Sequence, residues 1–160
     1  MTKTAVCALA AALFAGSVAA VQDGEIWDDT VELDVWYVGA AGMVTLPQGG
    51  DGRLGGAAMR FGHCLNEFWA LEGEVAWLEN RAGGALGVLW HWWGYERLDP
   101  FFTFGVRGIG GVDEGPKAGL GAFYNLTETL SLRFDADAML GLEGDASVTY
   151  SLSAGLQFSF

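Results

Sequence analysis

The sequence predicts an all-β fold, an antiparallel up-and-down barrel of eight strands, on three observations. Apolar and polar residues alternate with a period of two after residue 30, which is the pattern of strands and not of helices. Segments of about ten residues with this pattern follow one another and are separated by glycine-rich turns. The composition suits strands that all pair, with 25 glycines and 3 prolines in 160 residues, because proline removes a donor from a β-ladder.

The first twenty residues have the features of a secretory signal peptide. Lys3 gives the start a positive charge, Ala5 to Ala15 form an apolar run, and Ser17 to Ala20 are the small residues of a cleavage site. The apolar run is too short for a membrane-spanning helix, which needs about 20 residues. We predict that residues 1–20 are cleaved and that residues 21–160 form a single barrel domain.

The strands follow in order, and the last one has the clearest pattern. Apolar and polar residues alternate without interruption from Ser147 to Phe160, whereas strands of globular proteins usually have about 5–6 residues. We expect the connection over residues 42–53 to be the longest, and Gly110 to Pro116 to form a turn. The predicted strands cover residues 30–41, 54–64, 68–79, 84–94, 100–111, 117–126, 129–141 and 146–160.

The first predicted strand has an alternation that assigns its residues to two faces. Tyr37 falls on the apolar phase, which we expect to face outward. Trp36 falls on the opposite phase, together with Glu32 and Asp34. We therefore expect these two carboxylates, and the ring of Trp36, to face inward.

The direction of the apolar faces decides between a water-soluble and a transmembrane barrel. Segments of about ten residues match tilted membrane strands, and their other face is rich in glycine, alanine and serine, which fit a narrow interior. Aromatic residues gather near the segment ends, as at the two interfaces of a membrane. These residues are Trp36, Tyr37, Trp69, Trp77, Trp92, Trp93, Tyr95, Phe101, Phe102, Phe158 and Phe160. The sequence thus predicts a transmembrane barrel, which leaves no strand edge unpaired in lipid.

Charge and cysteine content exclude several other classes of protein. The chain has 20 acidic and 8 basic residues, a net charge of −12, which argues against a nucleic-acid partner. Its 51% of hydrophobic residues excludes an acidic disordered chain. After cleavage only Cys64 remains, so no intramolecular disulfide can form.

Three motifs carry a resemblance to a known family. The run from Gly119 to Arg133 reads GLGAFYNLTETLSLR, Asp99 to Phe101 read DPF before a glycine-rich strand, and Gly155 to Phe160 read GLQFSF. This chain resembles the small eight-stranded outer-membrane β-barrel proteins, that is, the outer-membrane-protein-A-like transmembrane domains and the opacity-type porin family. The resemblance is good over residues 99–160 and rests on the alternating pattern alone over residues 30–98.

The resemblance implies a location and two partners. It implies an outer-membrane protein whose termini face the periplasm, surrounded by the lipid bilayer and inserted by the outer-membrane assembly machinery. We expect a monomer. The C-terminal strand would carry the assembly signal, whose residues are Tyr150, Leu152, Leu156, Phe158 and Phe160.

Charged residues on the inward phase are the main candidate site. They comprise six carboxylates, three arginines and one histidine: Glu32, Asp34, Arg60, Glu72, Glu74, His91, Arg107, Arg133, Asp135 and Asp137. Unpaired charge is costly in a dry interior, so the acidic excess implies either entry of water or protonation of some carboxylates. One interpretation is a salt-bridged plug in a barrel with a structural or surface-interaction role. The alternative is a narrow water-filled path that prefers cations.

Other functions have less support in the sequence. A third reading is an exported soluble barrel with its apolar face inward around an apolar ligand. We expect no enzyme, because neither His63 nor His91 has an evident serine or aspartate partner at a strand end. We also expect no cofactor and no metal site. A surface ligand would bind the extracellular loops, of which the one over residues 42–53 is the longest.

Overall fold

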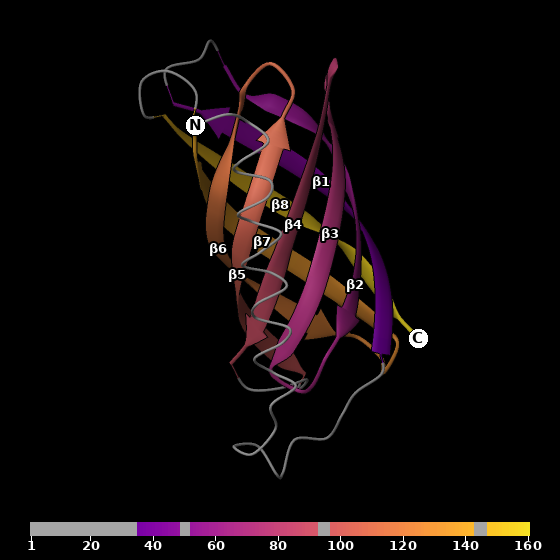
Figure 1. Ribbon diagram of the computed structural model, residues 1–160. Coiled ribbons are helices and arrows are strands. Elements are labelled where there is room, and N and C mark those ends of the chain that lie inside the picture. Colours follow the sequence, from indigo (N-terminus) through magenta and orange to yellow (C-terminus); the bar gives the residue numbers. More distant parts are fainter. Residues whose placement is uncertain (1–34, 49–51, 93–96, 143–146) are drawn as a thin grey trace, which may run out of the picture. The chain divides into compact units, whose positions relative to one another are not determined.

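Eight antiparallel strands form a closed barrel in the computed structural model, which describes residues 35–48, 52–92, 97–142 and 147–160 (Figure 1). Each strand pairs with the next in sequence, and β1 pairs with β8 to close the sheet. The predicted all-β, eight-stranded up-and-down fold is confirmed. The strands are β1 Val35–Pro47, β2 Leu54–Cys64, β3 Trp69–Leu78, β4 Arg81–His91, β5 Leu98–Ile109, β6 Asp113–Asn125, β7 Leu130–Leu140 and β8 Val148–Ser159.

The two ends of the barrel differ, and we name them by what they carry. The terminus end has the start of β1, the turns before β3 and before β7, and Phe160. The hairpin end has the β3–β4 and β5–β6 turns, at the top of Figure 1. These turns are short because Glu79 and Gly111 adopt positive φ angles of 52° and 69°, which suit tight connections.

Large apolar side chains cover the outside of the barrel. Phe61 and Leu86 are 54% and 58% exposed, and alternate residues of every strand behave in the same way. The inward residues between them are buried and mostly small, polar or charged. A soluble barrel around an apolar ligand would need the opposite arrangement, so the third reading does not fit. Among the described residues no helix has the length and apolarity needed to cross a membrane.

The first strand differs from its prediction in bounds and in phase. It extends to Pro47, and Tyr37 is 3% exposed whereas Trp36 is 51% exposed. Tyr37 faces inward because its hydroxyl donates a hydrogen bond to Glu72 Oε2 inside the barrel (2.9 Å), and Trp36 packs outside against the His63 ring. Alternation alone could not determine which phase of β1 faces outward. Either choice places one aromatic residue, Trp36 or Tyr37, on the outer face.

The β5–β6 connection is also shorter than predicted. Pro116 lies within β6, opposite Val106 of β5, whereas the sequence placed it in a turn. The β6–β7 pairs begin only at Lys117, so Pro116 is outside the stretch where β6 pairs on both sides. A missing N–H is tolerated at such a position.

Candidate functional site

The interior of the barrel is filled in three layers along its axis. An aromatic layer near the terminus end includes Tyr37, Leu89, Phe101 and Phe123. A second apolar layer near the hairpin end contains Met43, Ala58, Ala76, Leu78 and Ile109. Charged residues occupy the strand positions between the two layers. We call them the charged belt: Arg60, Glu72, Glu74, Arg107, Lys117, Arg133, Asp135 and Asp137.

Seven of the belt residues form one continuous chain of alternating charge. Each arginine pairs with two carboxylates, and the two carboxylates inside the series, Glu74 and Asp135, each pair with two arginines. The N···O distance is 2.9 Å for Arg60–Glu74 and 3.1 Å for Arg60–Asp135. The chain runs Glu72, Arg133, Asp135, Arg60, Glu74, Arg107, Asp137. Every described ion pair in this chain is almost fully buried.

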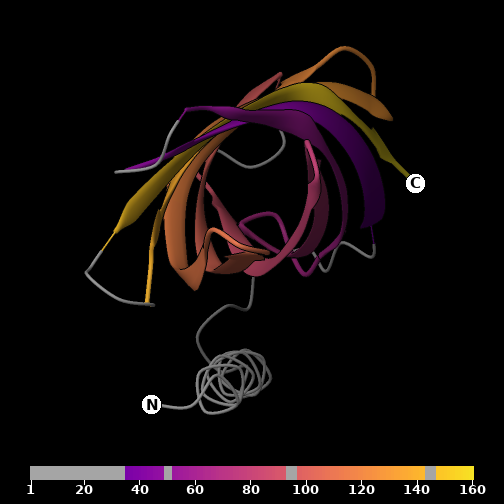
Figure 2. The same ribbon diagram turned by 90° about the horizontal axis from the view of Figure 1, so that it is seen from above.

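The chain of ion pairs crosses the lumen and does not follow one wall. Glu72 on β3 contacts Arg133 on β7, and these strands are four places apart in a ring of eight, hence opposite each other. Arg60 on β2 reaches Asp135 on β7, which is three places away in the same ring. Figure 2 looks down on the barrel and shows the strands arranged in a ring. The belt therefore ties β7 to β3, on the opposite wall, and to β2.

Serine and glutamine side chains of β8 complete the hydrogen bonding of the belt. Arg60 donates to Ser153 Oγ (2.7 Å), Arg107 donates to Ser151 Oγ (3.0 Å), and Ser153 donates to Asp135 (3.0 Å). Arg133 donates to Gln157 Oε1 (3.4 Å). Buried guanidinium and carboxylate groups need such additional partners to offset their loss of water.

Charges in the belt are balanced among the described residues. Four carboxylates face three arginines and Lys117, which is buried near Glu74 and Asp137. Lys117 was absent from the predicted inward residues, because the predicted strand only began there. The acidic excess was expected to include Glu32 and Asp34, which lie outside the described residues.

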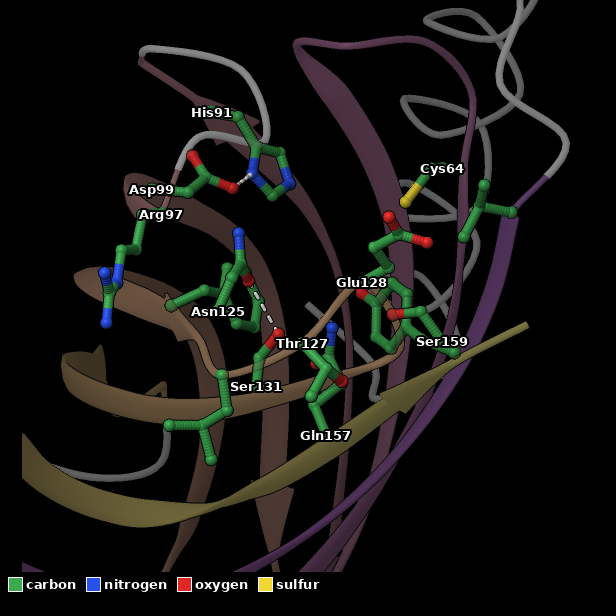
Figure 3. Close-up of a pocket in the computed structure, with 14 residues that line it drawn as sticks. Cys64, His91, Arg97, Asp99, Asn125, Thr127, Glu128, Ser131, Gln157 and Ser159 are labelled. Atoms are coloured by element: carbon green, nitrogen blue, oxygen red, sulfur yellow. Dashed lines mark hydrogen bonds and ion pairs between the residues drawn. The ribbon is translucent and has the colours of Figure 1, made fainter.

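A pocket of about 690 Å³ opens above the aromatic layer at the terminus end (Figure 3). Its lining comes from seven strands and from the β6–β7 turn. Aromatic and aliphatic side chains lie beside carboxamides and hydroxyls, including Tyr37, Phe123, Asn125, Ser131, Gln157 and Ser159. The lumen is thus hollow at one end and filled with charged side chains further in.

One wall of this pocket holds a buried histidine–aspartate hydrogen bond that was not predicted from the sequence. His91 Nδ1 lies 2.5 Å from Asp99 Oδ2, and both side chains are buried (Figure 3). The His91 ring stacks on Phe123, and Arg133 lies over Phe123 and Phe101 with centroid distances of 5.1 and 4.9 Å. The expectation that His91 has no aspartate partner is wrong. Asp99 was missed because it precedes the predicted strand start at residue 100.

The predicted site residues thus fall into three groups. The structure brings together Arg60, Glu72, Glu74, Arg107, Arg133, Asp135 and Asp137, and it places His91 apart from them, with Asp99. Glu32 and Asp34 lie outside the described residues. The predicted assembly-signal residues form an exposed row on the outer face of β8 and at the C-terminus: Tyr150, Leu152, Leu156, Phe158 and Phe160.

Comparisons with known proteins define the class of fold. No family model matches the chain, and no curated protein matches it in sequence. Among solved structures, it is similar to the outer membrane protein OprG from Pseudomonas aeruginosa (11% identity, TM-score 0.60, covering 81% of this chain and 97% of that chain). It is also similar to the N-terminal β-barrel domain of OprF from the same organism (19%, 0.55, 78% and 97%).

A third similar structure is that of Ail, the attachment invasion locus protein of Yersinia pestis (11% identity, TM-score 0.58, covering 81% of this chain and 100% of that chain). These neighbours are outer-membrane proteins, and identities of this size establish a shared fold only. The chain has the fold of the eight-stranded outer-membrane barrels.

Proposed function

We propose that this chain is an outer-membrane β-barrel whose lumen is closed by the charged belt, with a structural or surface-interaction role and no catalytic one. The apolar outer face and the barrel fold support a membrane location. The observation that carries the closed lumen is the chain of ion pairs from Glu72 to Asp137, which joins opposite walls.

The closed state follows from the energetics of the belt. Opening a path through the lumen would separate arginines from carboxylates that are held on two sides, and a buried charge left alone costs several kcal/mol. The apolar layer at the hairpin end, with Leu78 and Met43 at 0% and 3% exposure, adds a second barrier. Both layers would have to rearrange before ions could pass.

A narrow cation-preferring channel is the second candidate. Carboxylate-lined pores select cations, and the mature chain keeps a strong acidic excess. The described part of the belt has as many cationic as anionic groups, which removes the main argument for cation preference within the lumen. We therefore place this candidate below the closed barrel.

Conductance across planar lipid bilayers distinguishes the two candidates. We expect no sustained channel currents from the refolded protein. The triple variant Glu72→Ala/Arg133→Ala/Leu78→Ala is charge-neutral, removes the pair across the lumen and shortens a side chain of the apolar layer, so it should give measurable openings. The control, Glu79→Ala/Arg53→Ala, removes one exposed charge of each sign outside the belt. Steady cation-selective current from the unmodified protein would overturn the closed lumen and establish the channel.

The membrane location has a separate test. A folded membrane barrel migrates faster on a denaturing gel before boiling than after it, and it sediments with the outer membrane. We expect both results. Recovery of the protein in the soluble periplasmic fraction would contradict the proposal.

A further inference from the structure

An exposed arginine lies on the outer face of the barrel at the terminus end. Arg97 directly precedes β5, and its carbonyl oxygen accepts a hydrogen bond from the Asn125 N–H (2.9 Å). Its guanidinium lies over the ring of Tyr124, 5.3 Å from the ring centroid. Phe123 is buried inside the barrel, so the next residue, Tyr124, points outward. Figure 3 shows the Arg97 side chain turned away from Asp99. The positive charge is therefore held on the outer surface.

This charge has no counter-ion in the described parts of the chain. None of the ion pairs there includes Arg97. Arg97 is also the only exposed arginine or lysine that the described residues place at the terminus end, because Arg53 and Arg81 lie at the hairpin end. A guanidinium has donors only. The donors of Arg97 are thus available to an anion from outside the protein.

The surface around Arg97 is apolar and belongs to the outer face of the barrel. Leu98 is exposed and is paired directly with Tyr124. Trp90 of β4 and Trp92 just after it are exposed at the same end, and their rings stack with 6.4 Å between centroids. Tryptophans on the outside of membrane proteins lie at the level of the lipid head groups. Arg97 is therefore placed where head groups meet acyl chains.

A phosphate group matches this position in charge and in shape. A guanidinium presents its donors in a planar fork that fits phosphate oxygens, and the Tyr124 ring holds this guanidinium in place by a cation–π contact. The position among lipid-facing side chains favours a phosphate carried by a lipid over one that is free in solution. We propose that Arg97 and Tyr124 bind the phosphate of a membrane phospholipid, with its acyl chains against Leu98. This inference rests on the proposed membrane location, but it does not depend on whether the lumen is closed.

NMR titration of the protein refolded in maltoside micelles tests this site, because the head groups of this detergent carry no charge. Phosphatidylglycerol is added while the Arg97 Nε–H signal is followed. Diacylglycerol with the same acyl chains lacks the phosphate and is the matched comparison, and inorganic phosphate tests the free anion. We expect a saturable shift with phosphatidylglycerol and none with diacylglycerol or inorganic phosphate at the same concentration.

Variants test the two residues of the site, with binding followed on the Leu98 amide signal. Arg97→Gln removes the charge and should weaken phosphatidylglycerol binding roughly fivefold, the size expected for one arginine near a lipid surface. Tyr124→Leu removes the ring beneath the guanidinium and should weaken binding by a smaller factor. Arg53→Gln, which removes an exposed arginine at the hairpin end, should leave binding unchanged.

Three results would overturn the site. They are the absence of a saturable shift with phosphatidylglycerol, equal binding of diacylglycerol or inorganic phosphate, or full binding by Arg97→Gln. Migration of the same samples on a denaturing gel before and after boiling separates this inference from the proposed function. A heat-modifiable protein without the phosphate-dependent shift refutes the site alone, whereas a protein that is not heat-modifiable contradicts the membrane location as well.

Discussion

Arg133 on β7 is bound to Glu72 on β3 across the full width of the barrel, and its guanidinium also lies against the rings of Phe101 and Phe123. This one side chain therefore joins the charged belt to the aromatic layer. It also donates to Gln157, a residue of the pocket. Arg133 is the point at which the three features of the interior meet.

Removing Arg133 should destabilise the barrel strongly. Arg133→Met keeps much of the side-chain volume but leaves Glu72 and Asp135 without their shared cation. A broken buried ion pair costs about 3–5 kcal/mol, and we expect a loss of this size in urea unfolding from lipid vesicles. The control Arg53→Met changes an exposed arginine and should change the unfolding free energy by less than about 0.5 kcal/mol. Equal stability of the two variants would contradict a stabilising belt.

A tyrosine ring covers Gly62 inside the barrel. Tyr37 and Gly62 are directly paired across β1 and β2, and a Cβ at Gly62 would overlap the ring and the carbonyl oxygen of Leu71. Gly62→Ala should therefore cost about 1–3 kcal/mol, as overpacking does. Gly55→Ala on the same strand meets nothing within 4 Å, and its unfolding curve should match that of the unmodified protein.

Asp113 holds the β7–β8 connection against the start of β6. Its Oδ1 accepts from the Leu142 N–H (3.1 Å), and its Oδ2 accepts from the Ser147 hydroxyl (2.6 Å). Asp113→Ala should speed hydrogen exchange of the Gly141 and Leu142 amides roughly fivefold, because local opening loses these bonds. Glu114→Gln, at the neighbouring position, should leave the exchange rates unchanged. Unaltered rates in both variants would show that the connection is held by its backbone alone.

The C-terminal residue takes part in closing the barrel. Phe160 exchanges two backbone hydrogen bonds with Trp36, of 3.0 and 2.9 Å. Deletion of Phe160 removes both and truncates the predicted assembly signal. We expect a several-fold lower yield of heat-modifiable protein in the membrane, whereas Ser159→Ala should assemble normally. Normal assembly of the truncated chain would show that Phe160 is not part of the assembly signal.

The sequence was sufficient to predict the number of strands and, for most of them, which residues face inward. Alternation determines the face of a residue such as Arg60 or Arg107, because successive side chains point to opposite sides. It does not determine the height of a residue along the barrel axis, which depends on strand tilt and stagger. The pairing of Glu72 with Arg133 could not be read from the pattern for this reason.

Errors were concentrated where a strand begins. Lys117 and Asp99 were left out of the predicted interior because each lay at or before an expected strand start. The phase of Tyr37 was wrong because it was read from the apolar residues of 31–37, a segment that lies mostly before β1. Within β1 the exposed apolar phase is the other one, with Trp36, Val38, Val44 and Leu46. A boundary shift of a few residues thus changed the predicted charge balance of the lumen.

The chain of ion pairs has seven residues, and three of them belong to β7, which is the last strand but one: Arg133, Asp135 and Asp137. Until β7 is in place, Arg60 lacks one of its two carboxylates, and Arg107 does as well. A partly assembled sheet of β1 to β6 would therefore carry unmatched charge toward its own interior. Neutralisation comes only with the closing hairpin of β7 and β8, which makes completion of the barrel a cooperative, nearly all-or-none event.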